Sequence, residues 1–235
     1  MGTFLHLYET EEQLNEIYNG SGYTEPWVSY TREITKVHYN KKPEPIDYSK
    51  MLLTFEILDT DEGDSIIVNA NRQDRIEFKA NDEDWCEPSD TGTGHYEILV
   101  QPGDVVQIRG DYENSDLLKF NETKCRFNVY GNILSTYNST NFANITEIDD
   151  DSFTFDTFFQ NCNVVSAEDL IMPATSLTES CYKHMFNGCT SLTTAPALPA
   201  TTLAYSCYSN MFQDCTSLTA APELPATTLV DYCYR

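Results

Sequence analysis

The chain has 235 residues, of which 40% are hydrophobic and 12% aromatic, so it is long enough and apolar enough to bury a substantial core. Asp and Glu outnumber Lys and Arg by 37 to 14, and the formal net charge of −23 repels phosphate backbones and anionic lipid surfaces. We therefore expect no nucleic-acid partner. No stretch reaches the roughly 18 apolar residues of a membrane helix, so no membrane insertion is expected either.

Residues 1–45 are predicted to form a small N-terminal β-α-β-β module. The opening TFLHLY is apolar and β-rich, and a T-x-x-Q capping box at Thr10 opens a helix over 11–18. Two strands follow, at 27–30 and 34–39. The first residues lack the basic and apolar regions of a secretory signal, so classical export is not expected.

Residues 46–135 are predicted to form an antiparallel β-sandwich domain. Short runs of alternating polarity alternate with turn signals such as QPGD and SDTGTG, at the spacing of such a sandwich. The predicted strands are 51–58, 65–69, 75–79, 95–101, 104–109 and 124–130.

Residues 136–235 contain an internal repeat of 26 residues. The segments 177–202 and 203–228 align without a gap, and because they differ at eight positions they are identical at 18 of 26. A third copy begins at Leu229 and breaks off at Arg235, and a degenerate earlier copy begins at Phe158. The repeat predicts a C-terminal leucine-rich-type solenoid and completes a mixed α+β/all-β fold class.

The run CTSLTTAPALPATTLAYSCYSNMFQDC resembles BspA-like leucine-rich repeats, in a variant found in gut Bacteroidales and their phages. The resemblance covers 158–235 and extends more loosely to 127–133 and 166–170. The opening, with FLHLYET and EPWVSYT, is similar to the start of many such proteins. The resemblance implies adhesion, recognition or a place in a phage appendage, with no catalytic residues and no cofactor.

Positions that differ between the repeat copies are the candidate binding positions. Identical positions are expected to stack in the interior, whereas the differing ones are mostly polar or small and are expected to face solvent. The candidate binding residues are Glu179, Lys183, His184, Thr194, Tyr205, Ser209 and Asn210.

The cysteines and histidines do not form a metal-binding pattern. Six of the eight cysteines occupy repeat positions and no C-x-x-C pair occurs, which favours buried thiols over a disulfide framework or a metal site. The sequence leaves undecided whether Cys86 and Cys125 form a disulfide. Trp85 could stack on a sugar ring, although packing is the preferred interpretation.

Three functional hypotheses follow, and the first is preferred. The first is a non-enzymatic part of a phage virion, a fibre or decoration, attached to other virion proteins through its N-terminal module and forming a homo-oligomer, with a trimer favoured. The second is an extracellular or cell-surface bacterial adhesin that binds a host protein or glycan. The third is a carbohydrate-active enzyme, for which no carboxylate pair can be located.

Overall fold

The computed structural model describes residues 46–60, 65–70, 75–90, 95–111, 118–120, 122–148 and 155–235. The predicted N-terminal β-α-β-β module lies outside these residues. Asp47–Arg235 form one compact unit. No helix in the described ranges is long and apolar enough to cross a membrane.

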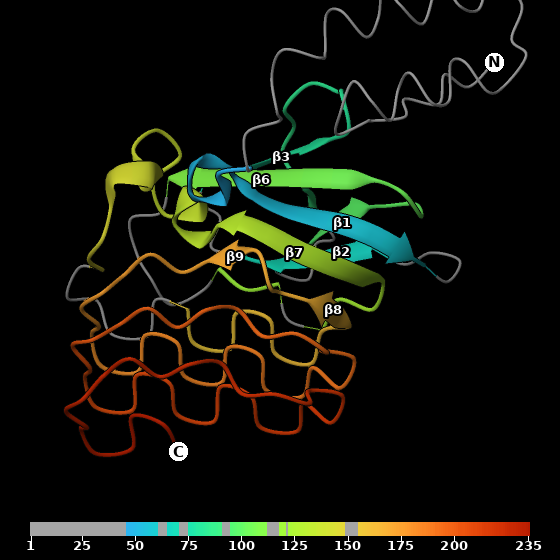
Figure 1. Ribbon diagram of the computed structural model, residues 1–235. Coiled ribbons are helices and arrows are strands. Elements are labelled where there is room, and N and C mark those ends of the chain that lie inside the picture. The colour runs from blue at the N-terminus through green and yellow to red at the C-terminus, as the bar shows by residue number, and fades with distance from the viewer. Residues whose placement is uncertain are drawn as a thin grey trace, which may run out of the picture. The chain divides into compact units, whose positions relative to one another are not determined.

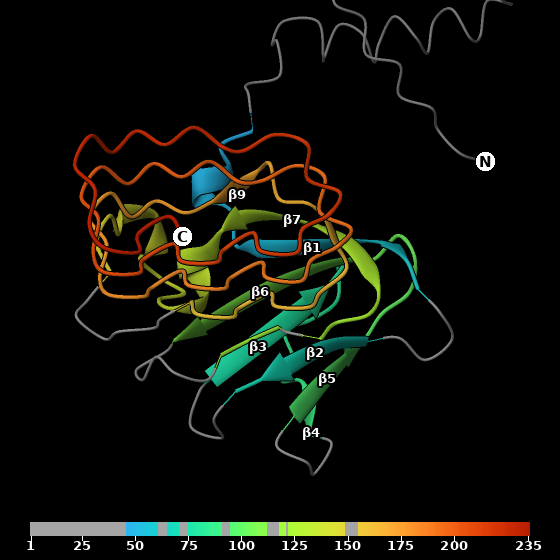
Figure 2. The ribbon, with the colours of Figure 1, turned by 90° about the horizontal axis from the view of Figure 1, so that it is seen from below.

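The described residues contain nine strands and three short 3-10 helices. The strands are β1 (Leu53–Asp59), β2 (Ser65–Asn69), β3 (Arg75–Ala80), β4 (Ser89–Asp90), β5 (His95–Leu99), β6 (Val105–Asp111), β7 (Arg126–Asn132), β8 (Val164–Ser166) and β9 (Leu170–Ile171), and the helices are η1 (Tyr48–Lys50), η2 (Ile133–Thr136) and η3 (Phe142–Asn144). The larger sheet has the order β3-β6-β1-β7-β8, with β9 also paired to β7, and the smaller sheet has the order β2-β5-β4 (Figure 2).

Alternating polarity explains the strands between residues 46 and 135. In β1, Leu53, Phe55 and Ile57 are at most 1% exposed, whereas Glu56 between them faces solvent. In β6, Val106 and Ile108 are buried by the same alternation. All six strands predicted in this segment are present, and no end is displaced by more than two residues.

The predicted fold class, a mixed α+β fold ending in a leucine-rich-type solenoid, is wrong. The described residues contain no α-helix, and the repeats contain no regular element beyond the short strands β8 and β9. A leucine-rich unit needs a strand and a helical or 3-10 segment in every repeat. The repeats here are instead stacked coils built from consecutive turns (Figure 1). We refer to residues 155–180 as coil 1, 181–206 as coil 2 and 207–232 as coil 3.

Burial repeats with a period of four residues in the first part of each coil. In coil 2, the pairs Cys181-Tyr182 and Met185-Phe186 are buried, whereas the pairs between and after them, Lys183-His184 and Asn187-Gly188, are partly exposed. Every fourth residue has positive φ, at 56° for Ser180, 54° for His184 and 75° for Gly188. A non-glycine residue in this region costs about 1–2 kcal/mol, so hydrogen bonds and packing must offset the strain.

Backbone hydrogen bonds divide between the two directions of this pattern. The N–H groups of Tyr182, His184 and Phe186 donate to carbonyls of coil 3, on Cys207, Ser209 and Met211. The intervening N–H groups of Lys183, Met185 and Asn187 donate three residues back along the chain, to Ser180, Tyr182 and His184. One half of the N–H groups thus closes the turns along the chain, and the other half bonds to the following coil. In this way the buried N–H groups are satisfied without a regular strand.

The sheets supply the surface on which coil 1 stacks. Strand β7 pairs antiparallel with β1 on one side and, on the other, in parallel with β8 and β9, which belong to coil 1. The N–H of Phe120 donates to the carbonyl of Phe158, and that of Glu122 to Gln160. Because a terminal repeat needs a cap, these contacts show how the sheets cover the first coil of the stack.

Aromatic rings form two columns through the coils. One contains Phe155, Tyr182, Tyr208 and Tyr234, with successive ring centroids 5.5, 5.6 and 5.6 Å apart and interplanar angles of 14° or less. The other contains Phe159, Phe186 and Phe212, at 5.4 and 5.8 Å. Phe159 also contacts Phe55 of β1 at 6.0 Å, so the sheets and coils share one hydrophobic core.

Thiols form a third column beside these rings. The Sγ atoms of Cys162, Cys189 and Cys215 lie 2.8, 3.0 and 3.1 Å from the carbonyl oxygens of Phe120, Phe159 and Phe186, each in the preceding layer. Burial raises the pKa of Cys162 and of Cys181 to about 12. These thiols are therefore neutral core groups at physiological pH.

The hydroxyl of Tyr182 gives a stability prediction. The side chain is fully buried, its hydroxyl has no hydrogen-bond partner, and burial raises its pKa well above the usual value. Coil 1 has Phe155 at the equivalent place in the ring column. Tyr182→Phe should therefore increase the free energy of unfolding by about 1 kcal/mol, measured by urea denaturation, because an unsatisfied buried polar group disappears. Tyr208→Phe is the control with little expected change, and a destabilised Tyr182→Phe would contradict the argument.

Candidate functional site

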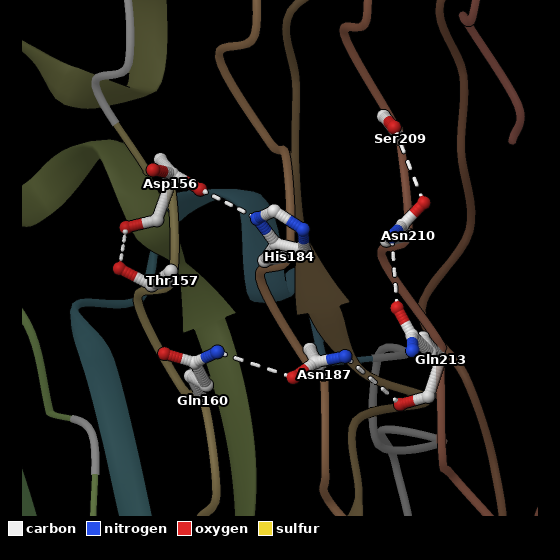
Figure 3. Close-up of polar contacts among 8 residues, drawn as sticks. All are labelled: Asp156, Thr157, Gln160, His184, Asn187, Ser209, Asn210 and Gln213. Atoms are coloured by element: carbon white, nitrogen blue, oxygen red, sulfur yellow. Dashed lines mark hydrogen bonds and ion pairs between the residues drawn. The ribbon is translucent and has the colours of Figure 1, made fainter.

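The outward pairs of the period-four pattern form a continuous polar strip across the coils. Coil 1 contributes Asp156, Thr157 and Gln160, coil 2 contributes Lys183, His184 and Asn187, and coil 3 contributes Ser209, Asn210 and Gln213. Figure 3 shows the side chains of eight of these residues, all but Lys183. Because the buried aromatic residues between these pairs are stacked, equivalent polar positions in successive coils are held side by side.

Amide side chains link the coils within the strip. Gln160 Nε2 donates to Asn187 Oδ1 at 3.1 Å, and Asn187 Nδ2 lies 3.5 Å from the backbone oxygen of Gln213. Asn210 Nδ2 donates to Gln213 Oε1 at 2.8 Å (Figure 3). These bonds hold the amides in fixed orientations, so the strip presents an ordered set of donors and acceptors.

An acidic and an imidazole group meet at the junction of coils 1 and 2. His184 Nδ1 lies 3.5 Å from Asp156 Oδ1, and the two side chains are 28% and 22% exposed. The contact is long for a hydrogen bond, and Asp156 Oδ1 is a buried oxygen without a hydrogen-bond partner. The junction of coils 1 and 2 therefore contains a buried carboxylate oxygen whose nearest charged neighbour is the imidazole of His184.

The structure brings four of the seven predicted binding residues together. Lys183, His184, Ser209 and Asn210 lie in the strip. Ser209 is only 5% exposed, so the expectation that the variable positions face solvent is wrong for this residue. Its Oγ donates to Asn210 Oδ1 at 3.3 Å, so the hydroxyl of Ser209 is used within coil 3.

The other three predicted residues lie outside the strip. Glu179 and Tyr205 occupy equivalent positions at the ends of coils 1 and 2 and are both exposed. The ring of Tyr205 is 46% exposed and packs edge-on against Tyr232 at 5.6 Å. Thr194 forms a parallel bridge with Ser166, the last residue of β8.

Five strip residues were absent from the predicted set. Asn187 and Gln213 differ between the aligned copies, so the rule that identified Lys183 applied to them equally. Gln160 belongs to the degenerate first copy, which begins at Phe158 and carries one extra residue before Pro173, and Asp156 and Thr157 directly precede that copy. All three therefore lie outside the simple 26-residue alignment.

A hollow separate from the polar strip lies on the larger sheet. It has a volume of about 260 Å³ and is lined by Tyr48, Glu56, Asn128, Tyr130 and Asp169, among others. Asn128 Nδ2 donates to Glu56 Oε2 at 2.9 Å, and the rings of Tyr48 and Tyr130 meet edge-on at 5.7 Å. Burial, together with nearby carboxylates, raises the pKa of both tyrosines, so they are neutral hydrogen-bonding groups at physiological pH.

Trp85 is engaged within the protein. The guanidinium of Arg109 lies 4.0 Å from the centre of its ring and also pairs with Glu77 at 2.8 Å. One face of the indole is therefore covered, which favours the packing interpretation over sugar stacking. Among the described residues, no group of three or more His, Cys, Asp or Glu side chains could hold a metal ion.

Comparison with known proteins adds no relative. No protein-family model matches the sequence, and neither the curated proteins nor the solved structures contain a match.

Proposed function

We propose that this protein is a non-enzymatic recognition protein whose polar strip binds a cell-surface protein or glycan. The observation that carries the proposal is the alignment of variable polar residues from three coils into one hydrogen-bonded surface. Its amide, hydroxyl, ammonium and imidazole groups match the donors and acceptors of sugars and polar protein surfaces. A rigid scaffold with variable side chains at fixed spacing is the arrangement of extended repeat-protein binding surfaces.

We further propose that the protein is part of a phage virion appendage. This rests on the resemblance to BspA-like repeats of gut Bacteroidales and their phages. In this proposal residues 1–45 attach the protein to other virion proteins, and a symmetric homo-oligomer, with a trimer favoured, presents several strips to one cell. Multivalency would convert weak single contacts into firm attachment.

The alternative is a secreted or cell-surface bacterial adhesin, which would use the same strip. The two differ in where the protein is assembled. Intact mass and light scattering on protein taken from its source separate them: copurification with virions as a symmetric oligomer supports the appendage, and a particle-free monomer supports the adhesin.

The strip is tested by exchanging residues between equivalent positions of neighbouring coils. In Lys183→Ser with His184→Asn, coil 2 acquires the residues that coil 3 has at 209 and 210, so the fold should tolerate the change. We expect binding to intact Bacteroidales cells and to arrayed surface polysaccharides to weaken about tenfold, because a charged donor is lost. Flow cytometry and array fluorescence measure the effect.

The matched control is Ala197→Glu, another exchange between equivalent positions, since coil 3 has Glu223 there. It lies outside the strip and should leave binding unchanged. Equal binding by all three proteins, with unchanged melting temperatures, would refute recognition by the strip.

A further inference from the structure

The hollow on the larger sheet lies where that sheet meets coil 1. Its lining comes from the adjacent strands β1, β7 and β8, together with η1 and the turn between β8 and β9 (Figure 1). Glu56 of β1 lies opposite Asn128 of β7, and Asn128 in turn pairs with Ser166 of β8. These three residues form a row across the sheet, on the face opposite to the buried Phe55 and Phe127.

The rings of Tyr48 and Tyr130 form a corner beside this row. Their centroids are 5.7 Å apart and their planes cross at 71°, so the two rings stand nearly at right angles. Tyr130 belongs to β7, and η1 is tied to the same strand because Asn132 Nδ2 donates to the carbonyl of Ser49 at 2.9 Å. Both rings are partly exposed in the hollow. The face of an aromatic ring carries negative charge density, so this corner is suited to a positively charged group.

Two carboxylates, those of Glu56 and Asp169, face the same hollow. Burial raises the pKa of the Tyr48 hydroxyl, and the charges of Asp169 and Glu56 add to this rise because they disfavour a phenolate beside them. Neither carboxylate has an ion-pair partner within the described ranges, and none of the described lining residues is Lys, Arg or His. The negative charge in the hollow is therefore not compensated by the protein.

This charge decides which ligand the hollow suits. A neutral sugar would displace water from Glu56 and Asp169 without supplying a counter-charge, whereas an ammonium or guanidinium group supplies one. The net charge of −23 also attracts cations to the surface. A divalent metal ion is less suited, because Ca²⁺ needs six or more oxygen ligands and the described residues contain no group of three metal-binding side chains. A volume of about 260 Å³ admits a small amine or the end of one side chain.

We propose that this hollow binds an organic cation, an alkylammonium or guanidinium group that lies in the corner of Tyr48 and Tyr130 and pairs with Glu56 and Asp169. The N–H groups of the ligand donate to the two carboxylates, and its alkyl part packs on the rings. The cation is either a free amine or a Lys or Arg side chain of a partner protein, since the two share the same chemistry. The polar strip takes no part in this binding, so the inference does not rest on the proposed function.

The test is a titration of the isotope-labelled full chain, followed by NMR. The probes are n-butylammonium and n-propylguanidinium, and the neutral comparators are n-butanol and methyl α-glucoside. We expect saturable shifts of the Asn128 side-chain amide and of the Gly131 amide, whose N–H donates to the carbonyl of Asp169. The dissociation constant of each cation should be on the order of 1 mM, and it should rise about threefold when NaCl is increased from about 20 to about 200 mM. The neutral compounds should produce no saturable shift.

Matched variants separate the hollow from the general acidity of the chain. Glu56→Gln keeps the size of the side chain and an acceptor for Asn128, but it removes the charge, so it should weaken binding about fivefold or more. Glu87→Gln removes the same charge from an exposed residue between β3 and β4 that does not line the hollow, and it should leave binding unchanged.

The two tyrosines are tested in the same way. Tyr48→Leu removes a ring face and should weaken binding about threefold, whereas Tyr130→Phe retains its ring and should change binding by less than about twofold. A drop of the same size in both variants would contradict a role for the ring faces.

The proposal is wrong if Glu56→Gln and Glu87→Gln weaken binding equally, because the cations are then attracted by the charge of the whole chain. It is also wrong if n-butanol or methyl α-glucoside saturates the same signals. Tighter binding of putrescine than of a blocked pentapeptide with one central lysine identifies a free amine, and the reverse identifies a side chain of a partner protein. Lys183→Ser with His184→Asn should leave butylammonium binding unchanged, so failure of the strip and failure of the hollow are distinguishable.

Discussion

Raising the pH from 8 to 10 should remove about 4 kcal/mol of stability through three buried thiols alone. Burial raises the pKa of Cys162 and Cys181 to about 12 and that of Cys215 to about 11. In the unfolded chain a thiol ionises near pH 8.5–9. Each thiol whose folded pKa is raised therefore stabilises the fold fully below pH 9, and that contribution is lost as the pH rises toward the folded pKa. At pH 10 each ionisable thiol costs slightly more than about 1 kcal/mol.

Urea denaturation of the reduced protein between pH 7 and pH 10 measures this loss. The free energy of unfolding should stay level to about pH 8 and then decline. Cys181→Ala removes one of the three groups, so it should lower stability at neutral pH but flatten the decline by about 1 kcal/mol. Cys86→Ser changes an exposed thiol and should leave the slope unaltered. A profile that stays level to pH 10 would show that the thiols are less buried than the coil packing requires.

The strands between residues 46 and 135 were predictable because one physical rule, a two-residue alternation of burial, governs them. Glu56 faces outward between Phe55 and Ile57, as the sequence indicates. The pairing of β7 with β8 and β9 was not predictable in this way, because it joins residues that are separated by a turn-rich linker and carry no shared pattern. Parallel pairing between distant segments leaves no local signal.

The prediction for the repeats was wrong for a different reason. The pattern C-Y-x-x-M-F-x-x-C has a period of four, which fits neither a strand nor an α-helix, and we assigned it to a leucine-rich unit by resemblance. The feature that accommodates this period is a left-handed residue at every fourth position, and those residues are Ser180, His184 and Gly188. Of these three residues only Gly188 indicates a left-handed conformation from the sequence, since serine and histidine adopt it less readily.

The sequence predicted some residues of the candidate site and missed others. Comparing the two clear copies located Lys183, His184 and Asn210, because variable positions tend to lie outside the shared core. It could not distinguish Ser209, which is variable but buried, from its exposed neighbours. Burial there depends on how the side chains of neighbouring coils fold over one another, which repeat alignment does not describe.

Replacing Gly131 with alanine should destabilise the protein by more than about 3 kcal/mol. Gly131 has φ of 84°, and a Cβ atom there would lie 2.1 Å from the backbone oxygen of Leu52. The strain of the left-handed region costs about 1–2 kcal/mol, and the clash adds to it because the obstructing atom belongs to the backbone and cannot rotate away.

The position of Gly131 makes the effect reach both halves of the unit. Its N–H donates to the carbonyl of Asp169 at 3.1 Å, and it pairs with Leu170 of β9, in coil 1. The next residue, Asn132, donates to the carbonyl of Met51 at 2.9 Å. Moving the backbone away from Leu52 therefore loosens the contact between the sheet and the coils on which the polar strip is built.

Gly103→Ala is the matched control, since Gly103 has φ of 91° but nothing within 4 Å of the added Cβ. It should cost only about 1 kcal/mol. Urea denaturation followed by circular dichroism compares the two variants, and hydrogen exchange at the amide of residue 131, whose N–H donates to the carbonyl of Asp169, reports whether β9 detaches first. If the two alanine variants are equally stable, the close approach of Gly131 to Leu52 does not constrain the fold. If Gly131→Ala alone is strongly destabilised and the pairing of β7 with β9 opens first, the backbone position set by Leu52 is what keeps β7 in register with coil 1.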